Sequence, residues 1–356
     1  MHAHKNASTT VDLEYEQLSF SPRQTALLAE SADRIAAAGG PELPGAIACA
    51  SAAALRLYRS FNAGQRDIVR RYSDGHLAVL ECSGLLPPRQ DPPPSDLPPL
   101  HVLENAPECL HLAARNQILL HLVKHRAFAY DMDNNARLIR FVGNFCGGGL
   151  LPRADEPSDS SLELSSHAGL PLGPHTEAPY HCAIEPLDGH SPAPSTLILT
   201  ARWNPLGEPT CIIPMTPVID RIGARAALAL TSASFDYTRS DSFVTGSGSS
   251  GQAVSILQFD VNGGYALRYN SYRYSLNENA SPAAIAAFQA LNTQVRGSEV
   301  IKITLTASNA LLINNYRALH CRDIIRDNRR LLIRLFGYSR FVSPIVLNAD
   351  PLKVKG

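Results

Sequence analysis

The stretch Pro174-His175-Thr176-Glu177-Ala178-Pro179-Tyr180-His181 carries the clearest chemical pattern in this sequence. Residues two apart in a β-strand face the same side of a sheet, so His175 and Glu177 are expected to point together, with Thr176 turned away. A neutral imidazole and a carboxylate supply two of the three ligands of a ferrous site built from two histidines and one carboxylate. The pair alone is not specific, because a chain with 12 histidines contains such pairs by chance. A surface strand without a metal explains it equally well.

A third ligand has to come from a distant part of the chain, because one strand cannot surround a metal ion. The candidate is His320, which ends the segment 309–320, where an apolar run is followed by a polar turn. A structural histidine in a turn is the alternative, and the position directly after a buried strand makes it less attractive. His175, Glu177 and His320 are therefore the candidate metal ligands and catalytic residues.

Two arginines follow in the run Arg330-Leu331-Leu332-Ile333-Arg334. Strand alternation places Arg330, Leu332 and Arg334 on one face of the strand and the intervening residues on the other. Burying two arginines on an apolar face is costly unless anions meet them. A dicarboxylate cosubstrate supplies such anions, since the planar guanidinium matches a carboxylate with two parallel hydrogen bonds. An edge strand with solvated arginines is the alternative.

Composition limits the classes of function. The chain has 356 residues, 45% of them hydrophobic and 18% charged, which excludes intrinsic disorder and is enough for a large core. The 32 basic residues balance the 32 acidic ones, which argues against nucleic acid or an anionic membrane as the main partner. No apolar run is long enough to span a bilayer, and the first residues lack the apolar part of a secretion signal. Seven scattered cysteines without a Cys-x-x-Cys pair are typical of a reduced, cytoplasmic protein.

Helix start signals and short apolar runs predict the secondary structure. Ser21-Pro22-Arg23-Gln24 combines an N-cap serine, a proline in the first turn and a capping-box glutamine, and predicts a helix that ends near Ala38. Further helices are expected at 43–61, 105–125, 216–228 and 281–295. Strands are expected at 77–80, 138–142, 196–203, 229–237, 254–259, 301–305, 311–314 and 331–336. Helices concentrate in the N-terminal third and strands in the rest, which favours one α+β domain around a sandwich or barrel.

The three chemical motifs occur in the order His-x-Glu, distal histidine, arginine strand. With these motifs the chain resembles the clavaminate synthase-like branch of the Fe(II)/2-oxoglutarate-dependent dioxygenases, which includes asparagine and arginine β-hydroxylases of antibiotic pathways. The segments His175–His181, Leu311–His320 and Arg330–Arg334 carry the resemblance, and a looser resemblance extends from about Ser73 to Arg334. A glutamate as the carboxylate ligand is typical of this branch.

The resemblance implies an α+β fold with a double-stranded β-helix (jelly-roll) core and with N-terminal and inserted helices. The expected organisation is a single dioxygenase domain over 1–356, with a helical region at 1–72, a core at 73–340 that holds a helical insert at about 281–297, and a tail at 341–356. The implied cofactors are Fe(II), 2-oxoglutarate as cosubstrate and O2. The implied reaction is hydroxylation of an unactivated C–H bond, with desaturation or cyclisation as variants.

The resemblance also assigns residues. His175, Glu177 and His320 would bind iron. Arg334 corresponds to the arginine that holds the distal carboxylate of 2-oxoglutarate, assisted by Thr210, and Arg330 would lie near the cosubstrate or substrate. The loop between His320 and the two arginines is shorter than in clavaminate synthase, so which arginine binds the cosubstrate stays open.

The implied substrate is an amino acid or an amino-acid derivative, either free, peptidyl or carrier-bound. Ser165 and Ser166 match a serine pair that lines the amino-acid pocket of relatives. Arginine hydroxylases bind the guanidinium of their substrate with an acidic pair, and the matching stretch here, 268–272, contains Asn270 and Tyr272 but no Asp or Glu. Arginine as the substrate is therefore in doubt, and a neutral or aromatic-lined pocket is expected instead.

Two other classes of protein remain open. A zinc hydrolase also uses two histidines and a glutamate, although the HExxH helix motif is absent and no separate general base stands out. A non-catalytic, cupin-like binding module is the second alternative, and it would not need two inward-facing arginines.

Overall fold

The computed structural model describes residues 14–89, 91–145, 169–177, 184–187, 189–238, 251–259 and 264–356. Its helices are α1 (Pro22–Ala37), α2 (Ala46–Arg59), α3 (Ala63–Ser73), α4 (Leu100–Leu103), α5 (Pro107–Leu122), α7 (Thr216–Ala229) and α8 (Pro282–Arg296), with a 3-10 turn η1 (Asn134–Ala136). Its first strands are β1 (Tyr15–Ser19), β2 (Val79–Ser83), β3 (His125–Tyr130), β4 (Arg140–Gly143), β5 (Leu172–His175), β6 (Thr196–Trp203) and β7 (Pro209–Pro214). The remaining strands are β8 (Phe235–Tyr237), β9 (Gly251–Val254), β10 (Leu257–Phe259), β11 (Tyr265–Leu267), β12 (Tyr274–Leu276), β13 (Ile301–Thr304), β14 (Ala310–Asn314), β15 (Ala318–Arg322), β16 (Leu331–Ser339), β17 (Val346–Leu347) and β18 (Asp350–Val354).

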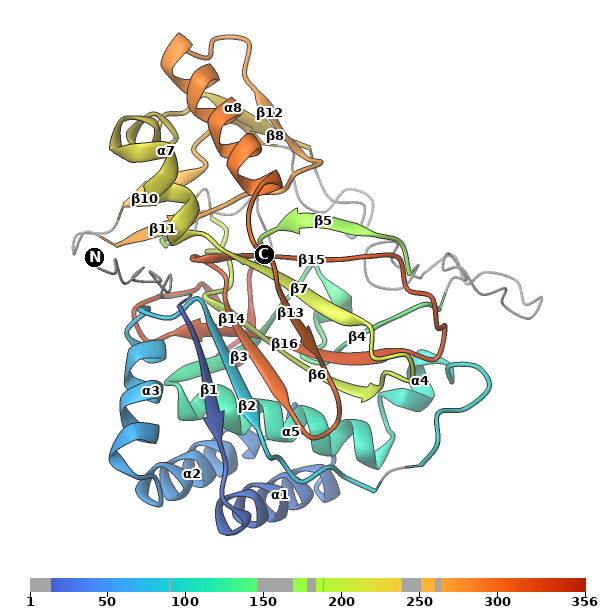
Figure 1. Ribbon diagram of the computed structural model, residues 1–356. Helices are drawn as coiled ribbons and strands as arrows, with labels where there is room; N and C mark the ends of the chain where they lie inside the picture. The colour runs from blue at the N-terminus through green and yellow to red at the C-terminus, as the bar shows by residue number, and fades with distance from the viewer. Residues whose placement is uncertain are drawn as a thin grey trace, which may run out of the picture.

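Two sheets form the centre of the molecule (Figure 1). The larger sheet has nine strands in the order β1-β2-β14-β6-β16-β3-β18-β17, with β4 also paired to β16. The smaller sheet has four strands in the order β13-β7-β15-β5. A shared core contains side chains of both sheets, among them Leu197 and Leu199 from β6, Ile212 from β7 and Ile303 from β13. The functional residues described below lie at one end of this core.

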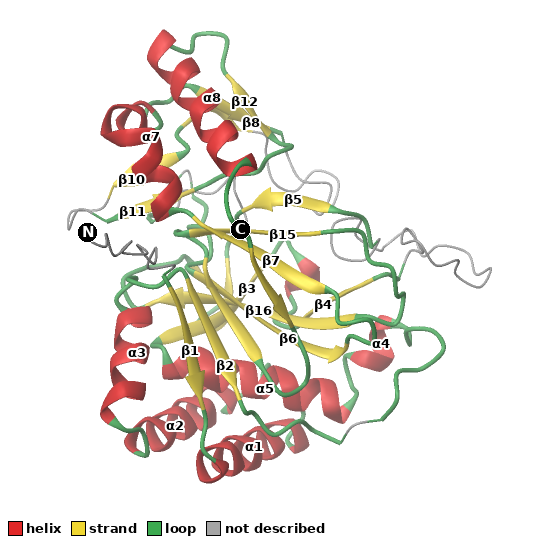
Figure 2. Cartoon of the chain, in the orientation of Figure 1, coloured by secondary structure: helices red, strands yellow, loops and turns green. Residues whose placement is uncertain are grey.

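Helices α1, α2 and α5 cover the outer face of the large sheet (Figure 2). Apolar side chains of these helices, such as Leu28 and Leu112, share a second core with Ile333 of β16. Arg115 of α5 is also buried there and donates hydrogen bonds to Thr200 Oγ1 of β6 at 2.8 Å and to Ala307 O at 2.7 Å. These bonds fix the helical layer to the sheet.

Strand β16 confirms the alternation expected for the arginine run. Leu331, Ile333 and Leu335 pack in the core under the helices, whereas Leu332 and Phe336 pack in the core between the two sheets. Arg334 therefore lies on the inner face, where the two sheets meet.

The described parts of 216–296, which are 216–238, 251–259 and 264–296, contribute a separate layer at the opposite end from α1 and α2 (Figure 1). Helices α7 and α8 pack with β8, β10, β11 and β12 around a third core that includes Met215, Phe235 and Leu291. Leu319 of β15 also belongs to this core, so the layer is anchored directly beside His320. Helix α8 lies in the stretch, about 281–297, for which a helical insert is expected, and α7 shares its core.

The expected α+β class is confirmed, with differences in detail. The expected helix after Ser21 is α1, and the capping box between Ser21 and Gln24 is present. The structure also contains helix α3, which was not predicted from the sequence. Asn62 and Gln65 form the same kind of capping box at its start. The strand expected at 229–237 is wrong over most of its length, because α7 continues to Ala229 and β8 begins only at Phe235. An apolar run does not by itself distinguish a helix end from a strand.

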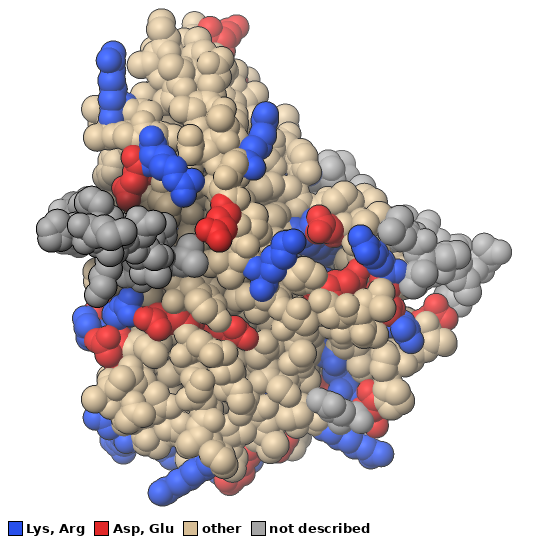
Figure 3. Space-filling view, viewed as in Figure 1, with Lys and Arg blue, Asp and Glu red and all other residues tan. Residues whose placement is uncertain are grey.

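Charged side chains of both signs occur on the surface, as the equal numbers of basic and acidic residues predict. Lys and Arg side chains are interspersed with Asp and Glu on the face shown in Figure 3. Among the described residues, no helix combines the length and the apolar character that crossing a membrane requires.

Candidate metal centre

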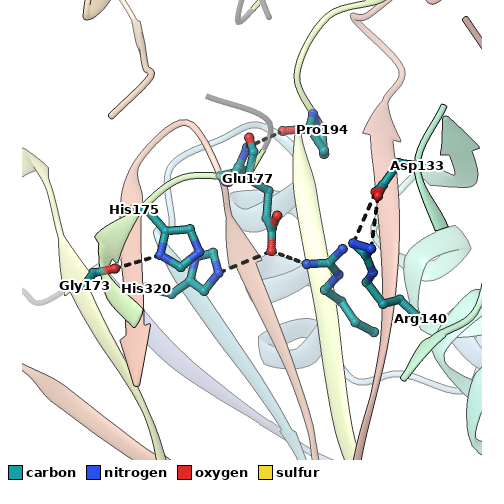
Figure 4. Close-up of polar contacts among 9 residues, drawn as sticks. Asp133, Arg140, Gly173, His175, Glu177, Pro194 and His320 are labelled. Atoms are coloured by element: carbon teal, nitrogen blue, oxygen red, sulfur yellow. Dashed lines mark hydrogen bonds and ion pairs between the residues drawn. The ribbon is translucent and has the colours of Figure 1, made fainter. Parts of the chain in front are cut away.

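The two candidate histidines lie on neighbouring antiparallel strands. His175 ends β5 and is paired directly with His320 of β15. Their rings are 4.1 Å apart between centroids and inclined by 45°. His175 Nδ1–H donates to Gly173 O at 2.8 Å, an arrangement that leaves Nε2 unprotonated and available as a metal ligand (Figure 4).

Backbone contacts place Glu177 next to the histidines. Asn315, in the turn after β14, accepts a hydrogen bond from Glu177 N at 2.9 Å and donates one to Glu177 O at 3.1 Å. Thr176 turns to the other side, where Thr176 N donates to Tyr269 O at 2.8 Å and Thr176 Oγ1 accepts from Tyr269 N at 3.1 Å. These contacts hold residues 176–177 from two sides and turn the side chain of Thr176 away from Glu177, as strand alternation predicts.

The three candidate ligands converge on one point. One ligand atom of each residue, two imidazole nitrogens and a carboxylate oxygen, lies within 4.8 Å of the other two. Glu177 Oε1 is 3.5 Å from His320 Nε2, and the same oxygen accepts a hydrogen bond from Arg334 Nη1. Two neutral imidazoles and one carboxylate suit ferrous iron or zinc, so the residues present fit such an ion.

The electrostatics of the centre favour the protonation states that bind a metal. Burial and, to a smaller extent, the neighbouring His320 together lower the pKa of His175 to about 3 against the opposing effect of Glu177, so the imidazole is neutral at pH 7. Burial alone would raise the pKa of Glu177, but Arg334 and the two imidazoles outweigh it and hold that pKa well below its usual range. A charged carboxylate and a neutral histidine are thus already in place.

A small cavity adjoins the centre at Arg334. Its wall contains a buried ion pair in which Arg140 of β4 donates to both oxygens of Asp133, at 3.0 and 3.3 Å (Figure 4). Arg140 lies directly opposite Arg334 in the sheet, and the aromatic ring of Phe336 packs against the Arg334 guanidinium at 4.2 Å. The cavity is therefore polar on one side and aromatic on the other.

Arg330 directly precedes β16, the strand that carries Arg334. It is 2% exposed, and its Nε and Nη1 atoms are buried without a hydrogen-bond partner among the residues that the structure describes. Burial lowers the pKa of Arg330 to about 10, partly offset by Glu208 and Cys211 of the β7 region, which flank Thr210. Thr210 is buried on β7. A buried guanidinium with open donors is a candidate anion site.

Two of the four candidate substrate-binding residues, Asn270 and Tyr272, lie in the described part of the structure. Ser165 and Ser166 lie outside the described residues. Asn270 forms an isolated β-bridge with His175, and its Oδ1 accepts a hydrogen bond from Tyr272 N at 2.9 Å. Tyr272 is 71% exposed, and its ring lies over Gly173, where a Cβ would come within 2.7 Å of the ring carbons. Asn270 and Tyr272, which lie between β11 and β12, thus border the centre.

Sequence patterns do not reveal three of the residues that shape this region. Asn315 follows Asn314 in a turn and shows no motif, and Asp133 and Arg140 form their ion pair only through the folded arrangement of η1 and β4. Two adjacent asparagines between two apolar strands predict a turn at this position. They do not predict that the side chain of Asn315 contacts the backbone of Glu177.

The chain was compared with known proteins. No protein-family model and no curated relative matches it. Among solved structures, it resembles the non-heme iron oxygenase OrfP in complex with Fe, succinate and (3S)-hydroxy-L-Arg, with 18% identity, a TM-score of 0.69 and coverage of 95% of this chain and 99% of that one. It also resembles an asparagine oxygenase in complex with Fe(II), (2S,3S)-3-hydroxyasparagine and succinate, with 17% identity, a TM-score of 0.67 and coverage of 96% and 99%. The expected likeness to these oxygenases is confirmed at the level of the fold.

Proposed function

We propose that this protein is an Fe(II)/2-oxoglutarate-dependent oxygenase that hydroxylates an unactivated C–H bond of an amino acid or an amino-acid derivative. The convergence of His175, Glu177 and His320 within 4.8 Å is the observation that carries the proposal. Solved structures with the same fold support it, because OrfP was crystallised with Fe and α-ketoglutaric acid and also with Fe and L-Arg.

The order of the strands supports a double-stranded β-helix as the core. From β5 to β7, and again from β13 to β16, successive strands belong alternately to the smaller and the larger sheet. A jelly roll is built by this alternation. We place the centre inside such a core, within one domain whose last described strand, β18, pairs with β3 of the large sheet.

His175, Glu177 and His320 would hold the metal ion. When bound, ferrous iron would supply the oxidation in which O2, 2-oxoglutarate and a C–H bond of the substrate give succinate, CO2 and the hydroxylated substrate. The Gly173 carbonyl orients His175, and Asn315 holds the backbone of Glu177. The chain thus contributes a fixed carboxylate and two neutral imidazoles.

Arg330 is the better candidate for the distal carboxylate of 2-oxoglutarate, with Thr210 beside it. Its buried Nε and Nη1 have open donor capacity, whereas Arg334 is already paired with Glu177. Hydrogen bonds from a charged guanidinium to a carboxylate are roughly twice as strong as those between neutral groups. Arg334 would then face the substrate, since it lines the cavity beside Arg140. Asn270, Tyr272 and the serines Ser165 and Ser166 are the proposed substrate contacts.

Anaerobic titration with Fe(II) and 2-oxoglutarate tests the proposal. An oxygenase gives a weak visible absorption band from charge transfer between iron and the bound keto acid, whereas a zinc hydrolase or a binding module gives none. We expect the band in the native protein and in Glu30→Ala, whose carboxylate is on the surface, and its loss in Glu177→Ala. Amino acids that stimulate succinate release then identify the substrate. Absence of the band in the native protein would refute the iron assignment.

A further inference from the structure

Two cysteines outside the metal centre face each other across neighbouring strands. Cys211 of β7 is paired directly with Cys321 of β15 in antiparallel register, and each thiol shifts the pKa of the other. Both are free cysteines, Cys211 buried and Cys321 partly exposed. Directly opposed residues of an antiparallel pair have Cα atoms about 4.5–5.5 Å apart, inside the range of about 4.4–6.8 Å that a disulfide bridges.

This thiol pair lies behind the proposed ligand and cosubstrate residues. Cys321 follows His320, and Cys211 follows Thr210, in the two central strands of the smaller sheet (Figure 1). His320 is paired with Ile212, whose side chain belongs to the core between the sheets, so alternation turns both thiols to the outer face. The thiols therefore do not reach the metal, but they link the strands that carry His320 and Thr210.

We propose that Cys211 and Cys321 are a redox-sensitive modification site, at which hydrogen peroxide closes a disulfide that ties β7 to β15. One thiol is oxidised by peroxide to a sulfenic acid with release of one water molecule, and the second thiol displaces a second water molecule to form the S–S bond. Each sulfur loses one electron overall, and both peroxide oxygens end as water. Dithiothreitol reduces the disulfide back to two thiols and is itself oxidised to a cyclic disulfide.

Burial and nearby charges determine how fast peroxide oxidises the two thiols. Burial raises the pKa of the Cys211 thiol, so this thiol is protonated and neutral at pH 7. Lys302 lies directly opposite Cys211 on β13, and its charge, with that of Arg330, counteracts part of the rise for Cys211. Because the thiolate is the reactive form, the reaction is expected to need excess peroxide and hours rather than seconds.

Peptide mapping tests the proposal without any metal or activity. Reduced protein with metal removed by EDTA is treated with hydrogen peroxide, free thiols are alkylated, and trypsin digestion follows without reductant. We expect the peptide 203–221 to be joined to the peptide 318–322, and the joined species to disappear with dithiothreitol. The same species should form in Cys49→Ser, which removes an exposed cysteine, and be absent in Cys321→Ser.

Two further measurements test whether the two thiols are adjacent and whether the disulfide ties β7 to β15. One equivalent of phenylarsine oxide, which bridges two adjacent thiols, should protect both cysteines from alkylation in the native protein. Amide hydrogen exchange in β7 and β15 should slow after oxidation and recover on reduction. Oxidation of either cysteine alone, a bond to a different cysteine, or unchanged exchange would overturn the proposal. None of these results depends on the proposed oxygenase activity.

Discussion

Arg334 and His320 contact the same oxygen of one carboxylate, Glu177 Oε1. The guanidinium keeps Glu177 charged, yet it also places a positive charge at the edge of a site that would receive a divalent cation. Arg334 therefore has opposing effects on the centre, since it prepares the ligand and repels the metal.

Replacing Arg334 with Gln should strengthen metal binding, because glutamine retains a donor for Glu177 without the charge. We expect Mn²⁺ to bind on the order of tenfold more tightly, equivalent to about 1.4 kcal/mol. Calorimetric titration of the metal-free protein measures this, and Arg340→Gln, which removes a charge from the surface, should have no effect. Weaker binding in Arg334→Gln would show that positioning of Glu177 dominates over repulsion.

Replacing Arg330 with Gln should raise the concentration of 2-oxoglutarate that half-saturates turnover. A charged hydrogen bond to a buried carboxylate contributes about 1.5–3 kcal/mol, so the increase should be roughly 10- to 150-fold. Arg329→Gln, which removes a half-exposed arginine paired with Asp327, is the matched control and should leave the requirement unchanged. A raised requirement in Arg334→Gln with none in Arg330→Gln would assign the cosubstrate to Arg334 instead.

Local sequence patterns predict the ligand types and the elements that carry them, because strand alternation and capping are short-range properties. They predict that His175 and Glu177 share a face and that Arg334 points inward. They do not predict that His320 pairs with His175, since register between strands far apart in the chain depends on the whole sheet. The contact between Asn315 and Glu177 and the ion pair of Asp133 with Arg140 depend on the same long-range arrangement.

Replacing Asn315 with Ala should weaken metal binding even though Asn315 is no ligand. Its side chain is buried, and it accepts from Glu177 N while donating to Glu177 O and Pro194 O. Loss of such a supporting contact typically reduces metal affinity about 10- to 100-fold. Asn314→Ala, at the adjacent last residue of β14, is the control, because it removes bonds to Leu77 O and Tyr316 N instead. Equal metal affinity in the two variants would mean that Glu177 is held by other contacts.

Acid should destabilise the fold partly through His125. This residue is 5% exposed in β3, with the ring of Tyr72 packed against it at 6.0 Å, and burial lowers its pKa to about 3. In the unfolded chain the pKa is about 6.5, so between about pH 6.5 and pH 3 the unfolded state binds a proton that the folded state does not. The stability contributed by neutral His125 is therefore complete above pH 6.5 and is lost as the pH falls through this window.

Replacing His125 with Phe should flatten that dependence, because phenylalanine fills a similar volume and binds no proton. The free energy of unfolding, measured by urea denaturation at several pH values, should then fall less steeply between pH 6.5 and 3, by at most about 1.4 kcal/mol per pH unit. His101→Phe, at an exposed position, should retain the native slope. If His125→Phe also retains it, the buried imidazole is not the group that couples folding to protons, and other buried groups must account for the loss of stability in acid.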